Sequence, residues 1–407
     1  MDTHTSDEQH TITSTTNPTP EHSIPFEFTG NTNEFFSIWI INVLLTILTL
    51  GIYSPWAKVR TYQYFYGNTQ LDGASFRYLA NPTQILKGRL IALVFFAAYY
   101  FSGLISTLAT GITIVVIALL IPAMVVMSMS FQLRNTSYRN IKFNFQKNFK
   151  RAYTIFAYPL LFVVPYFLLT TYFQSDLQPD AVATENNTET PLLIFLFAAL
   201  PLLIACLFPL WQHMIIKFKS AHAHFGQTRF NFSGTAGNLY GIYVSAFVTT
   251  SLLALLAMIA LTGLGNILAG VGNILSVDEA GGFSVKQFTV ILLIFLLMLS
   301  VYLWMFAYIQ TKKTNFIFGN LGIAKHRVQS ELEVGTMFYL YVTNTLAIAI
   351  SLGLLMPWAK IRTARYRAQM TSVIVTGDLD NFFGVRPEGQ SAFGEEMGEV
   401  FDMGLGV

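Results

Sequence analysis

The sequence has little charge for its length. Of its 407 residues, 11% are charged and 53% are hydrophobic, whereas about a quarter of the residues in soluble domains are charged. Several apolar runs reach the roughly 20 residues that a helix needs to cross a bilayer. The composition therefore excludes an ordinary soluble domain. It predicts an all-α polytopic membrane protein, a bundle of about eight hydrophobic helices.

Cysteine and catalytic motifs are nearly absent. Cys206 is the only cysteine and lies in an apolar run, so the chain has no disulfide framework. It contains no His-Glu-x-x-His, no P-loop and no Gly-x-Ser-x-Gly elbow. His222 and His224 could supply half of a metal site, but no cysteine or carboxylate follows them closely. We therefore expect no enzyme, no metal site and no cofactor.

Charged residues are also missing from the interiors of the clearest spans. Six spans are expected, in pairs, within residues 90–130, 153–216 and 239–309. Because proton-driven pumps usually need ionisable groups inside the membrane, their absence argues against proton-coupled transport. Residues 1–25 lack Lys, Arg and an apolar centre, so they predict a disordered polar tail and not a signal peptide.

Lysine and arginine are unevenly distributed along the chain. Nearly all of them fall into five clusters, at residues 58–89, 134–151, 217–229, 312–327 and 360–367. The stretch 175–191 carries only acidic charges. By the positive-inside rule the clusters face the cytoplasm and the acidic loop faces outward. Because the clusters lie beside the spans, we expect them to contact anionic lipid headgroups and not nucleic acid.

One short pattern returns five times. It is a pair of aromatic residues separated by one residue, at Phe26–Phe28, Phe76–Tyr78, Phe143–Phe145, Phe230–Phe232 and Phe316–Phe318. Alternation is typical of strands, so we expect short cytoplasmic Phe-x-Phe strands that can pair into a small sheet. In three copies a proline lies 21 residues upstream, which indicates a repeat array of apolar hairpins and basic segments. This predicts a repeat-built transmembrane domain over residues 26–376.

A longer stretch occurs twice. Residues 42–64 and 344–366 share Asn, Gly, Pro, Trp, Ala, Lys, Arg, Thr and Tyr at one constant offset without a gap. Each copy is an apolar helix interrupted at Gly51 or Gly353, with a proline and a tryptophan shortly after. Basic residues flank the second copy on both sides, which a single spanning helix cannot satisfy. One interpretation is a broken or re-entrant helix at each glycine, and the other is a plain span with one misplaced basic loop.

The two copies carry the candidate site residues. These are Asn42, Gly51, Pro55, Trp56, Lys58, Arg60, Asn344, Gly353, Pro357, Trp358, Lys360 and Arg362. Interrupted helices at corresponding positions in the two halves of a chain indicate the binding site of a transporter. These residues are therefore candidates for a substrate path or a lipid-headgroup site. The alternative is a membrane-exit anchor, with Trp at the headgroup level and Lys and Arg reaching the phosphates. The two asparagines could line a polar path or form hydrogen bonds between helices.

The order of motifs resembles the YjgN family of bacterial inner-membrane proteins. The motifs are Phe26-x-Phe28-x-Gly30, Leu48-Thr-Leu-Gly-Ile-Tyr53, Trp56-Ala-Lys-Val-Arg60, Asn68-Thr69 and the acidic ending at 394–402. Pro55 and Pro357 depart from the family pattern, which usually has an aromatic residue before the tryptophan. The resemblance implies a multi-pass protein of the inner membrane and no established biochemical function.

Two functions remain open from the sequence. One is a transporter or channel for a small solute or lipid, with a pathway between the two interrupted helices. The other is a non-catalytic scaffold or regulator that acts on an unknown protein partner through its cytoplasmic segments. The acidic Gly-rich tail at 377–407 could dock on the basic clusters or remain solvated.

Overall fold

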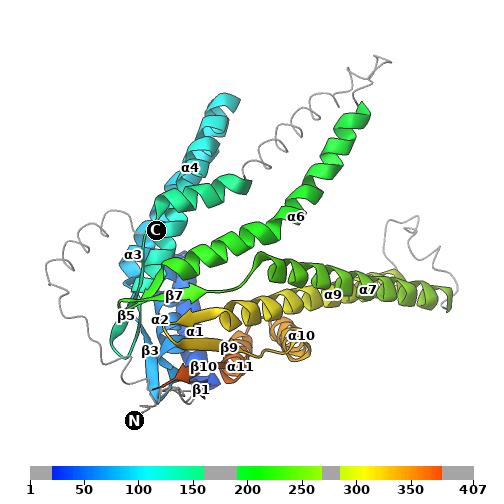
Figure 1. Ribbon diagram of the computed structural model, residues 1–407. Coiled ribbons are helices and arrows are strands. Elements are labelled where there is room, and N and C mark those ends of the chain that lie inside the picture. The colour runs from blue at the N-terminus through cyan, green and yellow to red at the C-terminus, as the bar shows by residue number, and fades with distance from the viewer. Residues whose placement is uncertain (1–20, 160–189, 268–284, 378–407) are drawn as a thin grey trace, which may run out of the picture.

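The computed structural model describes residues 21–159, 190–267 and 285–377. Short strands gather at one end of the molecule, and paired helices extend from them (Figure 1). The strands are β1 (Glu21–Phe28), β2 (Thr69–Leu71), β3 (Ala74–Tyr78), β4 (Thr136–Tyr138), β5 (Ile141–Phe145), β6 (Ala223–Phe225), β7 (Thr228–Phe232), β8 (Leu321–Ile323), β9 (His326–Ser330) and β10 (Thr371–Thr376).

The helices come in pairs between the strands, which is the expected form of the repeat unit. They are α1 (Thr32–Leu48), α2 (Ser54–Gly67), α3 (Pro82–Ile105), α4 (Thr107–Arg134), α6 (Thr190–His222), α7 (Ala236–Ile267), α9 (Val285–Gly319), α10 (Val334–Ile350) and α11 (Met356–Gln369). A further helical segment occupies residues 149–159. Each described pair leaves one strand and returns to the next, so the strands collect the ends of all the pairs.

The expectation of an all-α bundle is wrong. The ten strands form a closed antiparallel barrel, in the order β1-β10-β9-β8-β7-β6-β5-β4-β3-β2. The first strand closes the barrel because residues 21–25 pair with β10 and residues 26–28 pair with β2. A small open sheet would leave backbone groups unpaired at its two edges, whereas closure removes both edges. Residues 21–25, expected from the sequence to belong to the polar tail, are therefore part of the barrel wall.

The alternation of the Phe-x-Phe strands follows the two faces of the barrel. Phe76, Phe143 and Phe230 pack inward around the buried barrel core, while the intervening residues of these strands are exposed. The second aromatic ring of a pair lies at the helix end of the barrel. There the Phe232 ring comes so close to Gly234 that a Cβ atom at this glycine would lie 2.6 Å from it. The same contact, of Phe28 with Gly30, explains why glycine follows two residues after the aromatic pair in these two copies.

The pair Phe316–Phe318 does not form a strand, and this part of the repeat prediction is wrong. Both residues lie in the last turns of α9, where Phe316 packs against Leu239 and Ile216. The equivalent strand of this unit is β9, which has Val328 and Ser330 at the positions of the aromatic pair. An aromatic pair at spacing two is compatible with either a strand or a helix end, so the pattern alone could not separate them.

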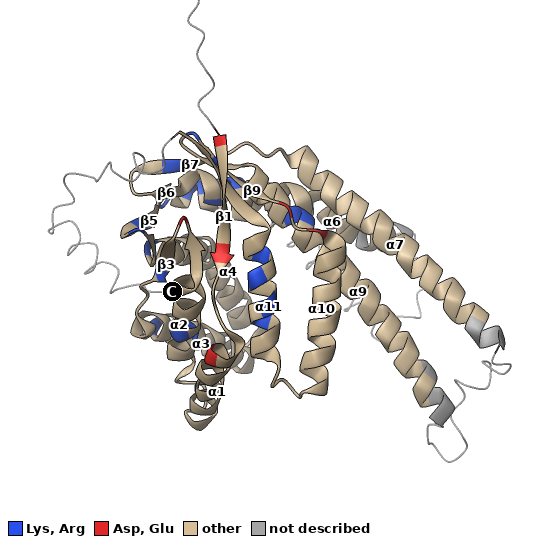
Figure 2. Ribbon diagram, turned by 90° about the horizontal axis from the view of Figure 1, so that it is seen from below, with Lys and Arg blue, Asp and Glu red and all other residues tan. Residues whose placement is uncertain are grey.

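Five of the described helices are long and apolar enough to cross a membrane. They are residues 82–105, 107–134, 198–222, 236–263 and 291–319. The sixth expected span falls largely at 160–189, outside the described residues. Lys and Arg gather on the barrel and on the helical segments next to it, and α7 extends away without charge (Figure 2). The positive-inside rule therefore assigns the barrel to the cytoplasmic side.

The two shorter pairs, α1–α2 and α10–α11, enter and leave at the barrel. The Thr29 amide donates to the Asn68 carbonyl at 3.0 Å, and the Glu331 amide donates to the Met370 carbonyl at 2.8 Å. Each pair is therefore a hairpin with both ends on one side, as in the re-entrant interpretation. The turns need Gly51 and Gly353, which have φ of +91° and +94°, because side chains rarely adopt this conformation.

Candidate functional site

The two predicted asparagines join the arms of the short hairpins. Asn42 and Asn344 are both buried. The Asn42 amide donates to the Ala57 carbonyl at 3.5 Å, and the Asn344 amide donates to the Ala359 carbonyl at 3.4 Å. Asn344 also donates to the Thr363 hydroxyl at 3.0 Å. The structure thus contains the interhelical hydrogen bonds that were one of the two interpretations.

The other predicted residues of the first hairpin lie around the start of α2. Pro55 is buried at the first turn of α2, and Trp56 stacks on Tyr53 with ring centroids 6.1 Å apart. Lys58 and Arg60 are exposed. The Arg60 guanidinium lies over the Tyr53 ring at 5.8 Å. This arrangement has the form of a surface anchor, with aromatic rings and cations on one short helix.

In the second hairpin, two predicted residues border a cleft. Pro357 is buried at the first turn of α11 and Lys360 is exposed. Trp358 and Arg362 instead line a cleft of about 340 Å³ between α10, α11 and the start of α1. Trp358 and Arg362 therefore lie together in the cleft. Asn344 joins them, because Oδ1 of Asn344 lies 3.5 Å from Nη1 of Arg362. It does not bring the two hairpins' predicted residues into one shared site.

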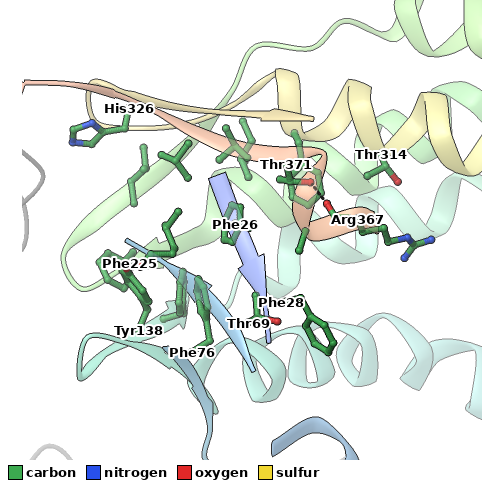
Figure 3. A pocket seen from close by; sticks show the side chains of 18 of the residues that line it. Phe26, Phe28, Thr69, Phe76, Tyr138, Phe225, Thr314, His326, Arg367 and Thr371 are labelled. Carbon is green, nitrogen blue, oxygen red and sulfur yellow. Dashed lines mark hydrogen bonds between the residues drawn. The ribbon is translucent and has the colours of Figure 1, made fainter. Parts of the chain in front are cut away.

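A second cavity, larger than this cleft, lies inside the barrel, and no sequence pattern had indicated it. Its volume is about 670 Å³, within the range of about 300–1,000 Å³ that is usual for small-molecule sites. Its wall is almost entirely apolar, with phenylalanines from strands that are far apart in sequence (Figure 3). Eight strands enclose roughly one small ligand or their own side chains, so ten leave room inside.

The side chains of the barrel interior show that the cavity is not filled by the chain itself. Phe26, Phe76, Phe143 and Phe230 all line it, yet each is only half-buried. The hydroxyl of Tyr138 donates to the Leu71 carbonyl at 2.6 Å, so this polar atom is satisfied within the wall. An apolar void leaves its lining atoms without partners. The interior is therefore suited to an apolar ligand.

The two ends of the cavity differ. His326 and Arg367 lie at opposite ends (Figure 3). His326 is buried near the tip of the β8–β9 hairpin, whereas Arg367 comes from α11 at the helix end. Among the residues that line the cavity, Arg367 is the only exposed one. The cavity thus has an apolar interior and a single cation at the side where the helices begin.

The cavity reaches α11 because this helix has small residues where its repeat partner has large ones. Ala364 and Ala368 of α11 correspond to Tyr62 and Tyr66 of α2. Those tyrosines pack on the Tyr78 ring, with centroids 5.1 and 5.4 Å away. In α11, both alanines instead line the cavity. The same repeat therefore fills the space beside the barrel in one copy and leaves it open in the other.

Burial lowers the pKa of His326 from its usual value of 6.5, and the positive charge on His22 adds to this effect. The Thr376 amide donates to Nδ1 of His326 at 3.3 Å, which requires that nitrogen to be unprotonated. The folded state thus keeps His326 neutral, while the unfolded chain protonates it as the pH falls below about 6.5. The folded barrel therefore loses stability on acidification through that range.

We expect the melting temperature of the purified protein in detergent to fall between about pH 7.5 and pH 5.5. In His326→Gln the fall should be smaller, since glutamine does not titrate. Thermal unfolding of both proteins at several pH values measures the difference. An identical pH dependence of the two proteins would contradict a neutral His326 in the folded barrel.

Comparison with known protein families gives a match over most of the chain. The family described as a bacterial protein of unknown function (DUF898) matches residues 23–400. The chain belongs to this family. The matched range begins in β1 and includes β10, so it contains nearly the whole barrel as well as the helices.

The relatives carry one name. The inner membrane protein YjgN of Salmonella typhimurium is 27% identical over 377 residues, which cover 88% of this chain and 90% of the relative. The protein of the same name from Escherichia coli K12 is 25% identical over 380 residues, 89% of this chain and 90% of its own. No solved structure matches. The family and the apolar helices identify a multi-pass bacterial inner-membrane protein, as the motifs had indicated.

Proposed function

We propose that the protein binds a lipid-like amphiphile whose apolar chain occupies the barrel cavity, as a step in moving such molecules from or into the inner membrane. One observation carries this proposal. A closed barrel attached to membrane helices encloses an unfilled apolar cavity of about 670 Å³. Apolar cavities of this kind stay dry and take up apolar molecules.

The chemical class follows from the lining. The described residues that line the cavity include no carboxylate, no lysine and no second arginine, so a small polar solute would lose its hydration without gaining partners. An apolar chain would cover the half-buried phenylalanines. Arg367, at the helix end, can meet an acidic headgroup. A single-chain amphiphile with an acidic head satisfies both parts.

The proposed route differs from the pathway expected from the repeats. The cavity lies inside the barrel and meets α9 and α11, through Thr314 and Phe318 of α9 and Ala364 of α11. Helix α9 is among those long enough to cross the membrane. An amphiphile in the bilayer would therefore approach beside α9 and enter past α11. The alternative role, a scaffold without a ligand, gains no specific support from the described residues.

The test fills the space beside α11 with the two tyrosines that the first repeat carries at the equivalent positions. Ala364→Tyr/Ala368→Tyr gives α11 the side chains that α2 already carries at these positions. We expect at least about tenfold weaker binding of a fluorescent long-chain fatty acid, because two rings would occupy the space beside Arg367. Binding is measured by titration of the purified protein in detergent micelles.

A matched control places the same two side chains on an exposed helix surface. Ala92→Tyr/Ala98→Tyr changes exposed positions of α3, and it should bind the probe as the unchanged protein does. Because Ala368 is buried, a tyrosine at this position can prevent folding. If the double variant unfolds, the single variant Ala364→Tyr tests the side of the cavity that α11 lines. The proposal fails if the unchanged protein does not bind the fatty acid, or if folded Ala364→Tyr binds it with full affinity.

A further inference from the structure

The cleft lies on the face of α11 that does not line the barrel cavity. One of its residues differs in charge from the residue at the equivalent position of the first repeat. It is lined by Arg362, Arg365, Gln369, Tyr339, Trp358 and Thr32, among others. Arg362 has a counterpart in Arg60, but Arg365 corresponds to Gln63. The second hairpin thus adds a cation that the first lacks, and this cation lines the cleft.

Arg362 is held in a defined position. Its Nη1 donates to the Thr343 hydroxyl at 2.6 Å. Its guanidinium lies over the Trp358 ring at 5.1 Å and over the Tyr339 ring at 5.3 Å. Nη1 also donates to Oδ1 of Asn344 at 3.5 Å. Two aromatic faces and two hydrogen bonds fix the orientation of a planar cation without neutralising it. The guanidinium therefore retains donors and charge for a ligand.

Arg365 is fixed by a different contact. Its Nη2 donates to the Gly30 carbonyl at 3.2 Å, two residues before α1 begins at Thr32. A guanidinium has five N–H donors, so this bond leaves others for a ligand. The start of α1 borders the same cleft through Thr32, but Asn31 caps this helix and Glu34 lies in its first turn. The positive charge of the cleft therefore comes from the two guanidinium groups of α11.

Carboxylates do not neutralise the cleft. Within residues 21–159, 190–267 and 285–377, no ion pair joins an acidic side chain to Arg362 or Arg365. Two acidic residues lie close to the cleft along the chain. Glu333 accepts a hydrogen bond at 2.9 Å from Thr336, which lines the cleft, and Glu34 in the first turn of α1 accepts one at 3.3 Å from Tyr64. Both carboxylates therefore bind hydroxyl groups, and neither forms an ion pair with the two guanidinium groups.

We propose that this cleft binds a phosphate group, as a mono- or diester. Arginine forks match the geometry of phosphate oxygens and bind them through paired hydrogen bonds. The cleft lies at the level where α1 and α10 leave the barrel, which is where lipid headgroups meet a membrane protein. The phosphate can come from an anionic lipid headgroup or from a soluble phosphate ester, and both have the same chemistry.

The inference is independent of the barrel cavity. The cavity is lined by Ala364, Arg367 and Ala368, whereas the cleft is lined by Arg362 and Arg365 of the same helix. Because these residues face different sides of α11, a substitution in the cleft leaves the barrel lining unchanged. Fatty-acid binding should therefore be unaffected in the cleft variants, which separates a failure here from a failure of the proposed function.

The experiment titrates purified protein in zwitterionic detergent with three probes by calorimetry. The probes are inorganic phosphate, glycerol 3-phosphate and a short-chain phosphatidylglycerol. We expect at least one to bind, and Arg362→Gln to weaken its binding about tenfold or more. Arg60→Gln is the matched control, because Arg60 holds the equivalent repeat position and is exposed. Arg365→Gln, at an exposed position, tests the site if Arg362→Gln does not fold.

The pattern across probes identifies the source of the phosphate. Binding of phosphatidylglycerol alone indicates a membrane headgroup, and binding of glycerol 3-phosphate or phosphate with similar affinity indicates a soluble ester. The inference is overturned if the unchanged protein binds none of the probes. It is also overturned if Arg60→Gln weakens binding as much as Arg362→Gln and Arg365→Gln do.

Discussion

Replacing Val375 with aspartate is expected to prevent the barrel from closing. Val375 lies in β10, is 0% exposed and belongs to the apolar cluster inside the barrel. A carboxylate there would lose its hydration inside an apolar cluster, where the titratable neighbours are His22, opposite Val375 in the strand register, and His326, which accepts from the Thr376 amide. The cost should exceed about 4 kcal/mol. That is a large part of the roughly 5–15 kcal/mol that usually separates folded from unfolded domains.

The adjacent residue provides the control. Ile374 alternates to the other face of β10 and stands opposite Arg327 of β9 in the strand register. Ile374→Asp therefore places the carboxylate outside the barrel and next to a cation, so the protein should remain folded. Urea titration in detergent micelles compares the two variants. Part of the loss in Val375→Asp should be recovered at low pH, where the carboxyl group is neutral. Equal stability of the two variants would contradict a closed, apolar barrel.

The second large effect is expected at Phe35, where α1 leaves the barrel. Phe35 is 0% exposed. Its ring stacks on Tyr64 with centroids 5.2 Å apart and meets Phe65 edge-on at 4.8 Å. It therefore joins the two arms of the first short hairpin. Phe35→Ala removes these contacts and leaves a cavity, which costs about 3–5 kcal/mol at buried aromatic positions.

Phe36 makes the comparison possible within one helix turn. Its side chain is 38% exposed, so Phe36→Ala should change the free energy of unfolding by less than about 1 kcal/mol. The same urea titration measures both variants. Similar losses at Phe35 and Phe36 would mean that the first hairpin is not packed on the barrel as described, and would weaken the comparison of the two repeats.

Several parts of the architecture were predictable from local patterns. Gly51 and Pro55 interrupt an apolar run, and the same interruption at Gly353 and Pro357 made a pair of broken helices one of the two interpretations of these segments. Backbone conformation at these positions is a local property, since glycine permits positive φ and proline suits the first helical turn. The charge clusters likewise indicated which ends of the helices lie together.

The barrel could not be predicted in the same way. Four of its strands, such as β2 and β8, have only three residues, too few for an alternation to be recognised. The aromatic pairs indicated strands, but nothing in them specified closure, and one pair belongs to a helix. Closure depends on β1 pairing with β10, and these strands come from opposite ends of the described chain.

The sequence by itself determined the membrane class and the repeat. It also named Trp358 and Arg362 among its candidate residues and gave breaks at Gly51 and Gly353 as one of two interpretations of the short helices. These follow from apolar length, charge position and backbone-restricting residues, all of which act over a few neighbouring positions. Tertiary structure alone decided that the strands close around a cavity and that Trp358, Arg362 and Arg365 meet the start of α1. Such a cavity is the space left between side chains from strands and helices that are distant in sequence. Its size depends on how they pack together, as the exchange of Tyr62 for Ala364 between the repeats illustrates.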